Sequence, residues 1–346
     1  MIRVLIVDDS AIVRKVLAED LSKYKDIEVV GTAIDPYAAW DKIASLHPDV
    51  VTLDIEMPKM DGLTFLSNLM KHYPLPVVVV SSLTPQNSTN ALRALSLGAV
   101  EVITKPGSQY SVPADPAYLA RAVRAAAAAK ILKQSPAGEL SNGEPPAPPS
   151  LLQTTHKILA IGASTGGTQA IETVLRNLPA AVPGTVIVQH MPEFFTAPFA
   201  ERLNKLCPME VREARDGDYV VPGLALIAPG NKHLVLQQSG AKYAARIKDG
   251  PPVHHQRPAV DVLFQSVAKS AGSNAVGVIL TGMGADGAKG LLAMRESGSY
   301  TLAQDEKSCV VFGMPKEAIN MGAVHKVVPL SQMAQSIVAS LAFQGT

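Results

Sequence analysis

The chain has 346 residues, of which 47% are hydrophobic and 18% charged, and its formal net charge is +1. This length suits about two globular domains, each with its own core. The balanced charge argues against nucleic-acid binding, which requires clustered Lys and Arg in excess, and against attraction to a membrane surface. The apolar start of the chain is interrupted by Asp8 and Asp9. We therefore expect neither a signal peptide nor a membrane insertion, and predict a cytoplasmic protein.

The first part of the chain alternates short apolar stretches with amphipathic segments. The apolar stretches read IRVLIV, IEVVGTA, DVVTLDI, PVVVVSS and VEVITKP. Continuous apolar strands of this kind are typical of a parallel sheet covered on both faces. We therefore predict an α/β domain with a five-stranded parallel sheet over residues 1–134, followed by a linker over 135–151. The linker contains five prolines and two glycines and hardly any large apolar side chain, so it cannot pack.

Polar and charged side chains stand where four of these strands end, and they are Asp8, Asp9, Asp54, Ser81 and Lys105. The carboxyl ends of parallel strands meet at one edge of a sheet, so we expect these side chains to converge. Three carboxylates repel one another unless a cation lies among them, and Mg²⁺ suits oxygen ligands. A carboxylate beside such an ion can accept a phosphoryl group, which Ser81 and Lys105 would contact. Helix capping could explain one such residue, but not all five.

The stretches VLIVDDS, DVVTLDIEMPKMDG, VVVVSS and VITKP resemble, in order, the receiver domain of bacterial response regulators. The resemblance extends over residues 1 to about 125 and implies a flavodoxin-like fold. It implies that Asp54 is the phosphoacceptor. It also implies that Asp8, Asp9 and Asp54 bind Mg²⁺ together with the backbone carbonyl of Glu56.

The stretches KILAIGA, GTVIVQH and AVGVILTG repeat the strand pattern after the linker. Between them, GLALIAPGNKHLVLQQ reads as two strands joined into a hairpin by a Pro-Gly-Asn turn. We therefore predict a second α/β domain over residues 152–346. Its sheet is expected to be doubly wound and mostly parallel, with one antiparallel hairpin.

Ser164 stands at the bend of KILAIGASTGGTQAI, in the G-x-S-x-G pattern of a nucleophile that follows a strand and precedes a helix. A phosphate-binding turn would need the same glycines and the same helix N-terminus. The next strand ends on His190, whereas a dinucleotide-binding domain is expected to place an acidic residue there. Because histidine is a good general base, the pair favours a nucleophilic serine.

Asp286, in VILTGMGADGAKG, could orient the histidine from the other ring nitrogen, although it could also simply cap a helix. The backbone N–H of Met283 could form part of an oxyanion hole, and Thr165 lies in the same active-site loop region. We expect no metal in this domain, because His254 and His255 are adjacent and would face opposite ways in a strand.

The stretches IGASTGGTQAI, VIVQHMP, IAPGNKHL, RPAVDVLF, LTGMGADGAKG and AQDEKSCVVFGMPKEAI closely resemble the catalytic domain of bacterial chemotaxis protein-glutamate methylesterases and glutamine deamidases. The resemblance implies Ser164 as nucleophile, His190 as general base and then acid, and Asp286 as the orienting carboxylate. It implies γ-glutamyl methyl esters of chemoreceptors as the substrate and a histidine kinase as the phosphodonor.

Three positions depart from the patterns that these resemblances suggest. Val102 stands where many receivers carry Tyr or Phe, Phe194 where glycine is common, and Gln256 where histidine is common. Two alternative output functions agree less well with the sequence. A DNA-binding output domain conflicts with the net charge, and a nucleotide-binding output domain conflicts with His190.

Overall fold

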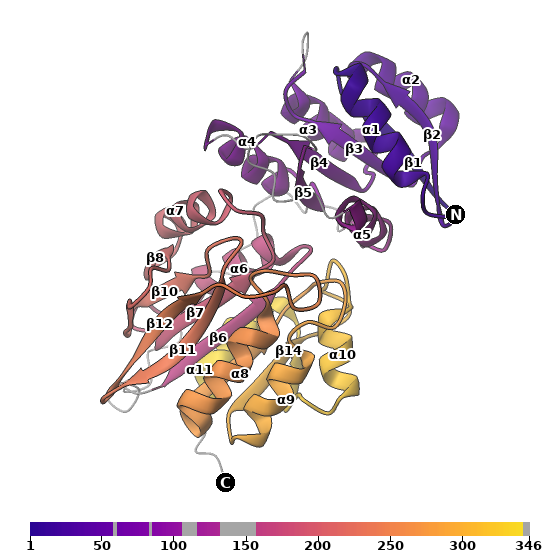
Figure 1. Ribbon diagram of the computed structural model, residues 1–346. Helices are drawn as coiled ribbons and strands as arrows, with labels where there is room; N and C mark the ends of the chain where they lie inside the picture. Colours follow the sequence, from indigo (N-terminus) through magenta and orange to yellow (C-terminus); the bar gives the residue numbers. More distant parts are fainter. Residues whose placement is uncertain (58–60, 83–84, 106–115, 132–156, 342–346) are drawn as a thin grey trace. The chain divides into compact units, whose positions relative to one another are not determined.

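The structure is a computed structural model that describes residues 1–57, 61–82, 85–105, 116–131 and 157–341. The chain divides into two compact units, Met1–Leu132 and Lys133–Thr346 (Figure 1). The predicted linker over 135–151 lies outside the described residues. No helix among the described residues is long and apolar enough to cross a membrane.

The first unit is the predicted five-stranded parallel sheet. Its strands are β1 (Ile2–Val7), β2 (Ile27–Ala33), β3 (Val50–Asp54), β4 (Val77–Ser81) and β5 (Glu101–Thr104). Its helices are α1 (Ala11–Leu21), α2 (Pro36–Leu46), α3 (Gly62–His72), α4 (Pro85–Ser96) and α5 (Pro116–Ala127). The strand order β2-β1-β3-β4-β5 places the second strand on one side of β1 and the third strand on the other. The carboxyl ends of β1 and β3 therefore lie at the switch point where ligands bind in open α/β sheets.

Local signals in the sequence start the helices of this unit. The side chain of Asp35 accepts a hydrogen bond from Ala38 N at 2.9 Å, and Pro36 occupies the first turn of α2. Asp61 caps α3 in the same way, accepting from Thr64 N at 2.8 Å. Such caps satisfy amides that have no partner within the helix. The cap of α1 is Ser10, and the N–H of Ser10 in turn donates to Asp8 Oδ1 at 2.8 Å, just past the end of β1.

The second unit contains a seven-stranded sheet in which all neighbouring strands are parallel, in the order β15-β14-β13-β6-β7-β10-β8. These strands are β6 (Ile158–Ala163), β7 (Gly184–Gln189), β8 (Glu210–Glu213), β10 (Leu224–Ile227), β13 (Ala275–Ile279), β14 (Tyr300–Gln304) and β15 (Lys326–Val328). The chain winds from β6 to β7 on one side and reaches β13 on the other. The switch point therefore lies between β6 and β13.

Helices cover this sheet, and they include a pair that packs tightly side by side, α8 and α9 (Figure 1). The helices are α6 (Gly167–Arg176), α7 (Thr196–Leu206), α8 (Val260–Ala271), α9 (Ala288–Glu296), α10 (Met314–Asn320) and α11 (Leu330–Ser340), with a short 3₁₀ helix at Gly272–Asn274. Helix α8 crosses β6 at Gly162, where a Cβ atom would lie 2.2 Å from a methyl group of Val260. Glycine at this position therefore lets the start of α8 approach the strand that leads to Ser164.

The antiparallel hairpin is present, but one connection later than predicted. Strand β10 belongs to the parallel sheet, whereas β11 (His233–Ser239) pairs with β12 (Lys242–Lys248), which also pairs with β9 (Tyr219–Val220). The Pro-Gly-Asn turn thus connects two different sheets. The hairpin turn is the two-residue loop after Ser239, where Gly240 has φ of 61°. A glycine in this left-handed region matches the twist of tight hairpins.

Candidate active site and phosphorylation site

The carboxyl ends of β1, β3 and β5 bring together Asp8, Asp54 and Lys105. The Lys105 Nζ atom lies 2.6 Å from Asp54 Oδ2 and 3.1 Å from Asp8 Oδ2. Both aspartates are almost fully buried. The ammonium group therefore partly neutralises two carboxylates that would otherwise repel each other.

Burial dominates the titration of these groups. It raises the pKa of Asp54 to about 6, with the charge of Asp8 adding to the shift, although the ion pair with Lys105 and an N–H from Glu56 oppose it. Burial also lowers the pKa of Lys105, but the ion pairs with Asp54 and Asp8 outweigh this effect and leave that pKa raised. The cluster is thus short of positive charge, even with its lysine.

The other receiver residues singled out from the sequence lie around this cluster. The amide of Glu56 donates to Asp54 Oδ1 at 3.1 Å, and Ser81 is buried at the end of β4. Carboxylate oxygens of Asp8, Asp9 and Asp54 lie within 4.8 Å of one another. Oδ2 of Asp8 is buried, and among the described residues its one neighbour of opposite charge is the Lys105 ammonium group 3.1 Å away. Three converging carboxylates that share a single lysine fit a hard, oxygen-seeking cation such as Mg²⁺.

Ser164 follows β6 directly, at the switch point of the second sheet. Its N–H donates to Thr281 O at 3.0 Å, and its carbonyl accepts from Gly167 N at 2.7 Å and from the Gln189 side chain at 2.9 Å. A Cβ atom on Gly282 would lie 2.7 Å from the Cβ of Ser164, so only glycine fits there. These contacts fix the serine backbone between the turns that follow β6 and β13.

His190 and Asp286 form the second half of the predicted triad. Nε2 of His190 lies 2.7 Å from Oδ2 of Asp286, and both side chains are nearly inaccessible to solvent. The N–H of His190 donates to Ala163 O at 3.1 Å, which places the histidine beside the Ser164 turn. Among the described residues, the Ser164 hydroxyl has no hydrogen-bond partner. Contacts of this kind often tighten only when substrate binds.

Asp286 is held by the start of α8 rather than capping its own helix. Oδ2 accepts from Val260 N at 2.7 Å, and Oδ1 accepts from Asp261 N at 2.9 Å. Burial raises the pKa of Asp286, but the bonds from His190 and these two amides outweigh it, so the pKa lies below its usual range. The positive end of the α8 dipole adds to this preference for the ionised form. The helix that follows Asp286 is capped instead by Gly287.

Thr165 and Met283 lie in the two turns that flank Ser164. The carbonyl of Thr165 accepts from the Thr281 hydroxyl at 3.0 Å, which ties the first turn to the second. The N–H of Met283 donates to no residue in the described part of the chain, and its side chain is partly exposed. An amide without a partner beside the serine is available to a developing oxyanion.

The structure shows the surroundings of the three positions that depart from the expected patterns. Phe194 has φ of 72°, in the left-handed region that favours glycine, and its residue is 45% exposed. Gln256 closes a turn by exchanging backbone hydrogen bonds with Val253 at 2.8 and 3.0 Å. Val102 lies buried within β5.

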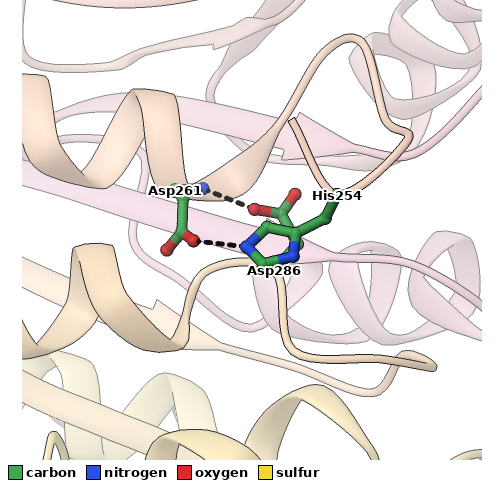
Figure 2. A group of neighbouring side chains, drawn as sticks. All are labelled: His254, Asp261 and Asp286. Atoms are coloured by element: carbon green, nitrogen blue, oxygen red, sulfur yellow. Dashed lines mark hydrogen bonds and ion pairs between the residues drawn. The ribbon is translucent and has the colours of Figure 1, made fainter. Parts of the chain in front are cut away.

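The expectation that His254 and His255 face opposite ways in a strand is wrong. Both occupy the turn that Gln256 closes, and both have positive φ, 51° and 62°. His254 therefore reaches Asp261, with Nε2 lying 3.0 Å from Oδ2 (Figure 2). Reasoning from the sequence missed Asp261, because nothing in RPAVDVLF separates a buried aspartate from a surface one at the start of a helix.

The group His254, Asp261 and Asp286 has donor atoms within 4.8 Å of one another, the spacing of a metal site. Its oxygens are already occupied, however. Each oxygen of Asp286 accepts a backbone N–H, and the oxygens of Asp261 accept from Gly290 N at 2.7 Å and bind His254. The group does not fit a metal, because binding one would break these bonds.

The fold and these two sites define a class of protein: a receiver domain joined to an α/β domain that carries a Ser-His-Asp constellation outside the α/β-hydrolase order. Residues 4–114 match the response regulator receiver domain, and residues 159–337 match the CheB methylesterase family. The chain belongs to the CheB methylesterase family. The match of the output domain removes the nucleotide-binding alternative.

Relatives and solved structures agree with this assignment. The chain is 59% identical over 337 residues to protein-glutamate methylesterase/protein-glutamine glutaminase 2 of Syntrophus aciditrophicus, an alignment that covers 97% of this chain and 98% of that protein. It is 55% identical to the Salmonella typhimurium protein-glutamate methylesterase/protein-glutamine glutaminase, covering 98% of this chain and 97% of that one. The crystal structure of the Thermotoga maritima CheB methylesterase catalytic domain superposes with a TM-score of 0.52 at 39% identity, covering 54% of this chain and 98% of that one.

Proposed function

We propose that this chain is a phosphorylation-activated serine hydrolase that demethylates γ-glutamyl methyl esters of chemoreceptors and deamidates specific glutamines. The observation that carries the proposal is the buried bond of 2.7 Å between His190 and Asp286, next to Ser164 at a sheet switch point. Membership of the CheB methylesterase family supplies the reaction class. The product of ester hydrolysis is methanol, and that of deamidation is ammonia.

In the first step Ser164 Oγ attacks the ester carbonyl while His190 accepts its proton. Because Nε2 of His190 is bound to Asp286, Nδ1 is the nitrogen left to take the proton. The imidazolium that forms is stabilised by the negative charge of Asp286. Hydrogen bonds from the amides of Val260 and Asp261 favour this ionised form of the carboxylate.

The oxyanion of the tetrahedral intermediate accepts from backbone amides, to which Met283 and the Thr165 turn contribute. His190 then returns its proton to the departing methanol, leaving an acyl-enzyme on Ser164. Water, deprotonated by the same histidine, hydrolyses this ester and releases the glutamate side chain. A glutamine side chain follows the same path, with ammonia in place of methanol.

The receiver controls this reaction through phosphorylation of Asp54. A bound Mg²⁺ would supply positive charge for the transferred phosphoryl group. Asp8, Asp9, Asp54 and the carbonyl of Glu56 are its proposed ligands. Ser81 would contact one phosphoryl oxygen, and Lys105, already beside Asp54, another.

The partners follow from these two activities. We infer that a chemotaxis histidine kinase donates the phosphoryl group, and that methyl-accepting chemoreceptors supply the substrate at their cytoplasmic helices. We accordingly propose that the chain acts in the cytoplasm. The proposed domain limits are 1–134 for the receiver, 135–151 for the linker and 152–346 for the catalytic domain.

The direct test is methanol release from methyl-labelled chemoreceptors, measured with and without a small phosphodonor. We expect release that rises with the phosphodonor and disappears in S164A. Equal methanol release by the wild-type chain and S164A would reject Ser164 as the nucleophile. Absence of release from the wild-type chain would reject the proposed substrate.

A further inference from the structure

A strained turn stands next to the candidate active site. Residues 253–256 form a tight turn in which Val253 and Gln256 exchange backbone hydrogen bonds at 3.0 and 2.8 Å. Both central residues, His254 and His255, have positive φ. Turns of this shape favour Gly, Asn and Asp, because most other side chains are strained at positive φ. Such strain persists only where the surrounding structure maintains it.

The two histidines of this turn differ in what they contact. His254 Nε2 lies 3.0 Å from Oδ2 of the buried Asp261, whereas His255 is exposed and makes no hydrogen bond to the described residues. The turn therefore brings one imidazole to a carboxylate that is 2% exposed. A buried carboxylate requires such partners.

Asp261 and Asp286 are linked reciprocally through two helix N-termini. Asp286, which stands just before α9, accepts the N–H of Asp261 at the start of α8. Asp261 in turn accepts the N–H of Gly290, in the first turn of α9, at 2.7 Å. Figure 2 shows His254, Asp261 and Asp286 joined in this order. The chain of contacts continues to His190, because Oδ2 of Asp286 binds its Nε2.

We propose that His254 and Asp261 are positioning residues for the hydrolytic reaction: they lock the start of α8 against α9 and so fix Asp286 in the orientation that binds His190. This inference rests on the proposed function for its reaction, but not for its geometry. Neither residue touches the substrate. The strained turn places the imidazole of His254 beside the carboxylate of Asp261.

The charges of the cluster explain why a histidine is needed. Asp261 and Asp286 are buried carboxylates, and burial raises the pKa of Asp261, with the charge of Asp286 adding to the shift. The bonds from Gly290 and His254 oppose this effect. The imidazole of His254 thus supplies one of the two hydrogen bonds that stabilise the Asp261 carboxylate beside Asp286.

The test compares His254→Asn with the matched control His255→Asn, in the full chain with saturating phosphodonor. Asn tolerates positive φ well, so both variants relieve the same backbone strain, and only the first loses the bond to Asp261. We expect H254N to lower kcat for methanol release roughly tenfold with KM unchanged, because misorientation of a catalytic group acts on the chemical step. H255N should keep the wild-type kcat. Equal kcat values in H254N and H255N would overturn the proposal.

A second pair of variants separates positioning from folding. Asp261→Asn keeps an oxygen for Gly290 N–H and an amide that can donate to neutral His254, so it should retain most of kcat, whereas Asp261→Ala should lose it. The far-downfield proton resonance of the His190–Asp286 bond gives a readout independent of substrate. It should shift in H254N and stay in place in H255N. An unchanged resonance in H254N would overturn the proposal, even if the receptor proved not to be the substrate.

Discussion

Oδ2 of Asp286 lies 2.7 Å from Nε2 of His190 and also 2.7 Å from the amide nitrogen of Val260. One carboxylate oxygen thus binds the proposed general base, His190, and the N-terminus of α8. The orientation of the histidine therefore depends on a helix that begins 26 residues earlier in the chain. Loss of the carboxylate should disturb both the tautomer of His190 and its position.

The first prediction concerns the triad. S164A, H190A and D286A should each lower kcat at least about 10³-fold while the fold is retained, because the three side chains act as one unit. The double variant S164A/H190A should be no slower than S164A alone, measured by methanol release and by circular dichroism for the fold. A double variant much slower than both single variants would contradict the assignment.

The second prediction concerns the ionisation of Asp54. Its pKa, raised by burial to about 6, should be visible in a carboxyl ¹³C titration without Mg²⁺. Because the pKa of Asp54 in the folded receiver lies above the usual aspartate value of 3.8, the folded receiver binds more protons than the unfolded chain between these pH values. The contribution of this group to stability therefore falls as the pH rises from about 4 to about 6.

Added Mg²⁺ should move the Asp54 titration to lower pH, since a cation favours the ionised carboxylate. K105M should move the Asp54 titration to higher pH, because in the wild-type chain the Lys105 ammonium opposes the rise in the Asp54 pKa. An Asp54 titration midpoint that moves neither on addition of Mg²⁺ nor in K105M would rule out the proposed cation site.

The third prediction separates the two domains. D54N should abolish phosphorylation by a small phosphodonor but keep the basal rate of methanol release, because Asp54 and Ser164 belong to different compact units. The matched control D61N alters an exposed cap residue of α3 and should leave phosphorylation intact. A folded D54N protein without basal activity would mean that the receiver supplies part of the catalytic site.

The sequence predicted the position of both sites because their side chains follow strands directly. Ser164, His190, Asp54 and Lys105 all stand at or just past a strand end, where a parallel sheet gathers its side chains. The contacts of Asp286 with α8 could not be predicted, since they depend on how α8 packs against α9. The prediction for His254 and His255 is wrong for a different reason: a turn and a strand differ there only in backbone φ, which the sequence does not reveal.

The fourth prediction concerns Phe194, which has positive φ in the loop that follows His190. F194G should be as stable as the wild-type chain or slightly more so, because relief of about 1 kcal/mol of strain offsets the greater chain entropy of glycine. F194A keeps the strain and loses the ring, so its melting temperature should be lower than that of F194G. Melting temperatures in the reverse order would show that the greater chain entropy of glycine outweighs the backbone strain. A melting temperature of F194G well below that of the wild-type chain would show that the ring contacts decide this position.

The last prediction concerns how phosphorylation reaches Ser164. A receptor helix is about 10 Å across, so the catalytic cleft must admit a broad substrate, and a constantly active esterase would erase the methylation signal. The proline-rich segment 135–151 can tether a receiver that limits this access, with phosphorylation shifting a closed and open equilibrium. A tenfold activation needs a change of only about 1.4 kcal/mol in that equilibrium.

If the receiver limits access, residues 152–346 expressed alone should release methanol faster than the unphosphorylated full chain and should not respond to a phosphodonor. If the receiver instead contributes affinity for the receptor, the fragment should be slower than the intact chain, with a raised KM. The comparison requires that the isolated fragment fold as it does in the full chain. Its melting temperature and its reaction with an active-site serine reagent can establish this. A folded fragment at or below the unphosphorylated rate would rule out gating, because removing an inhibitor cannot leave the rate unchanged.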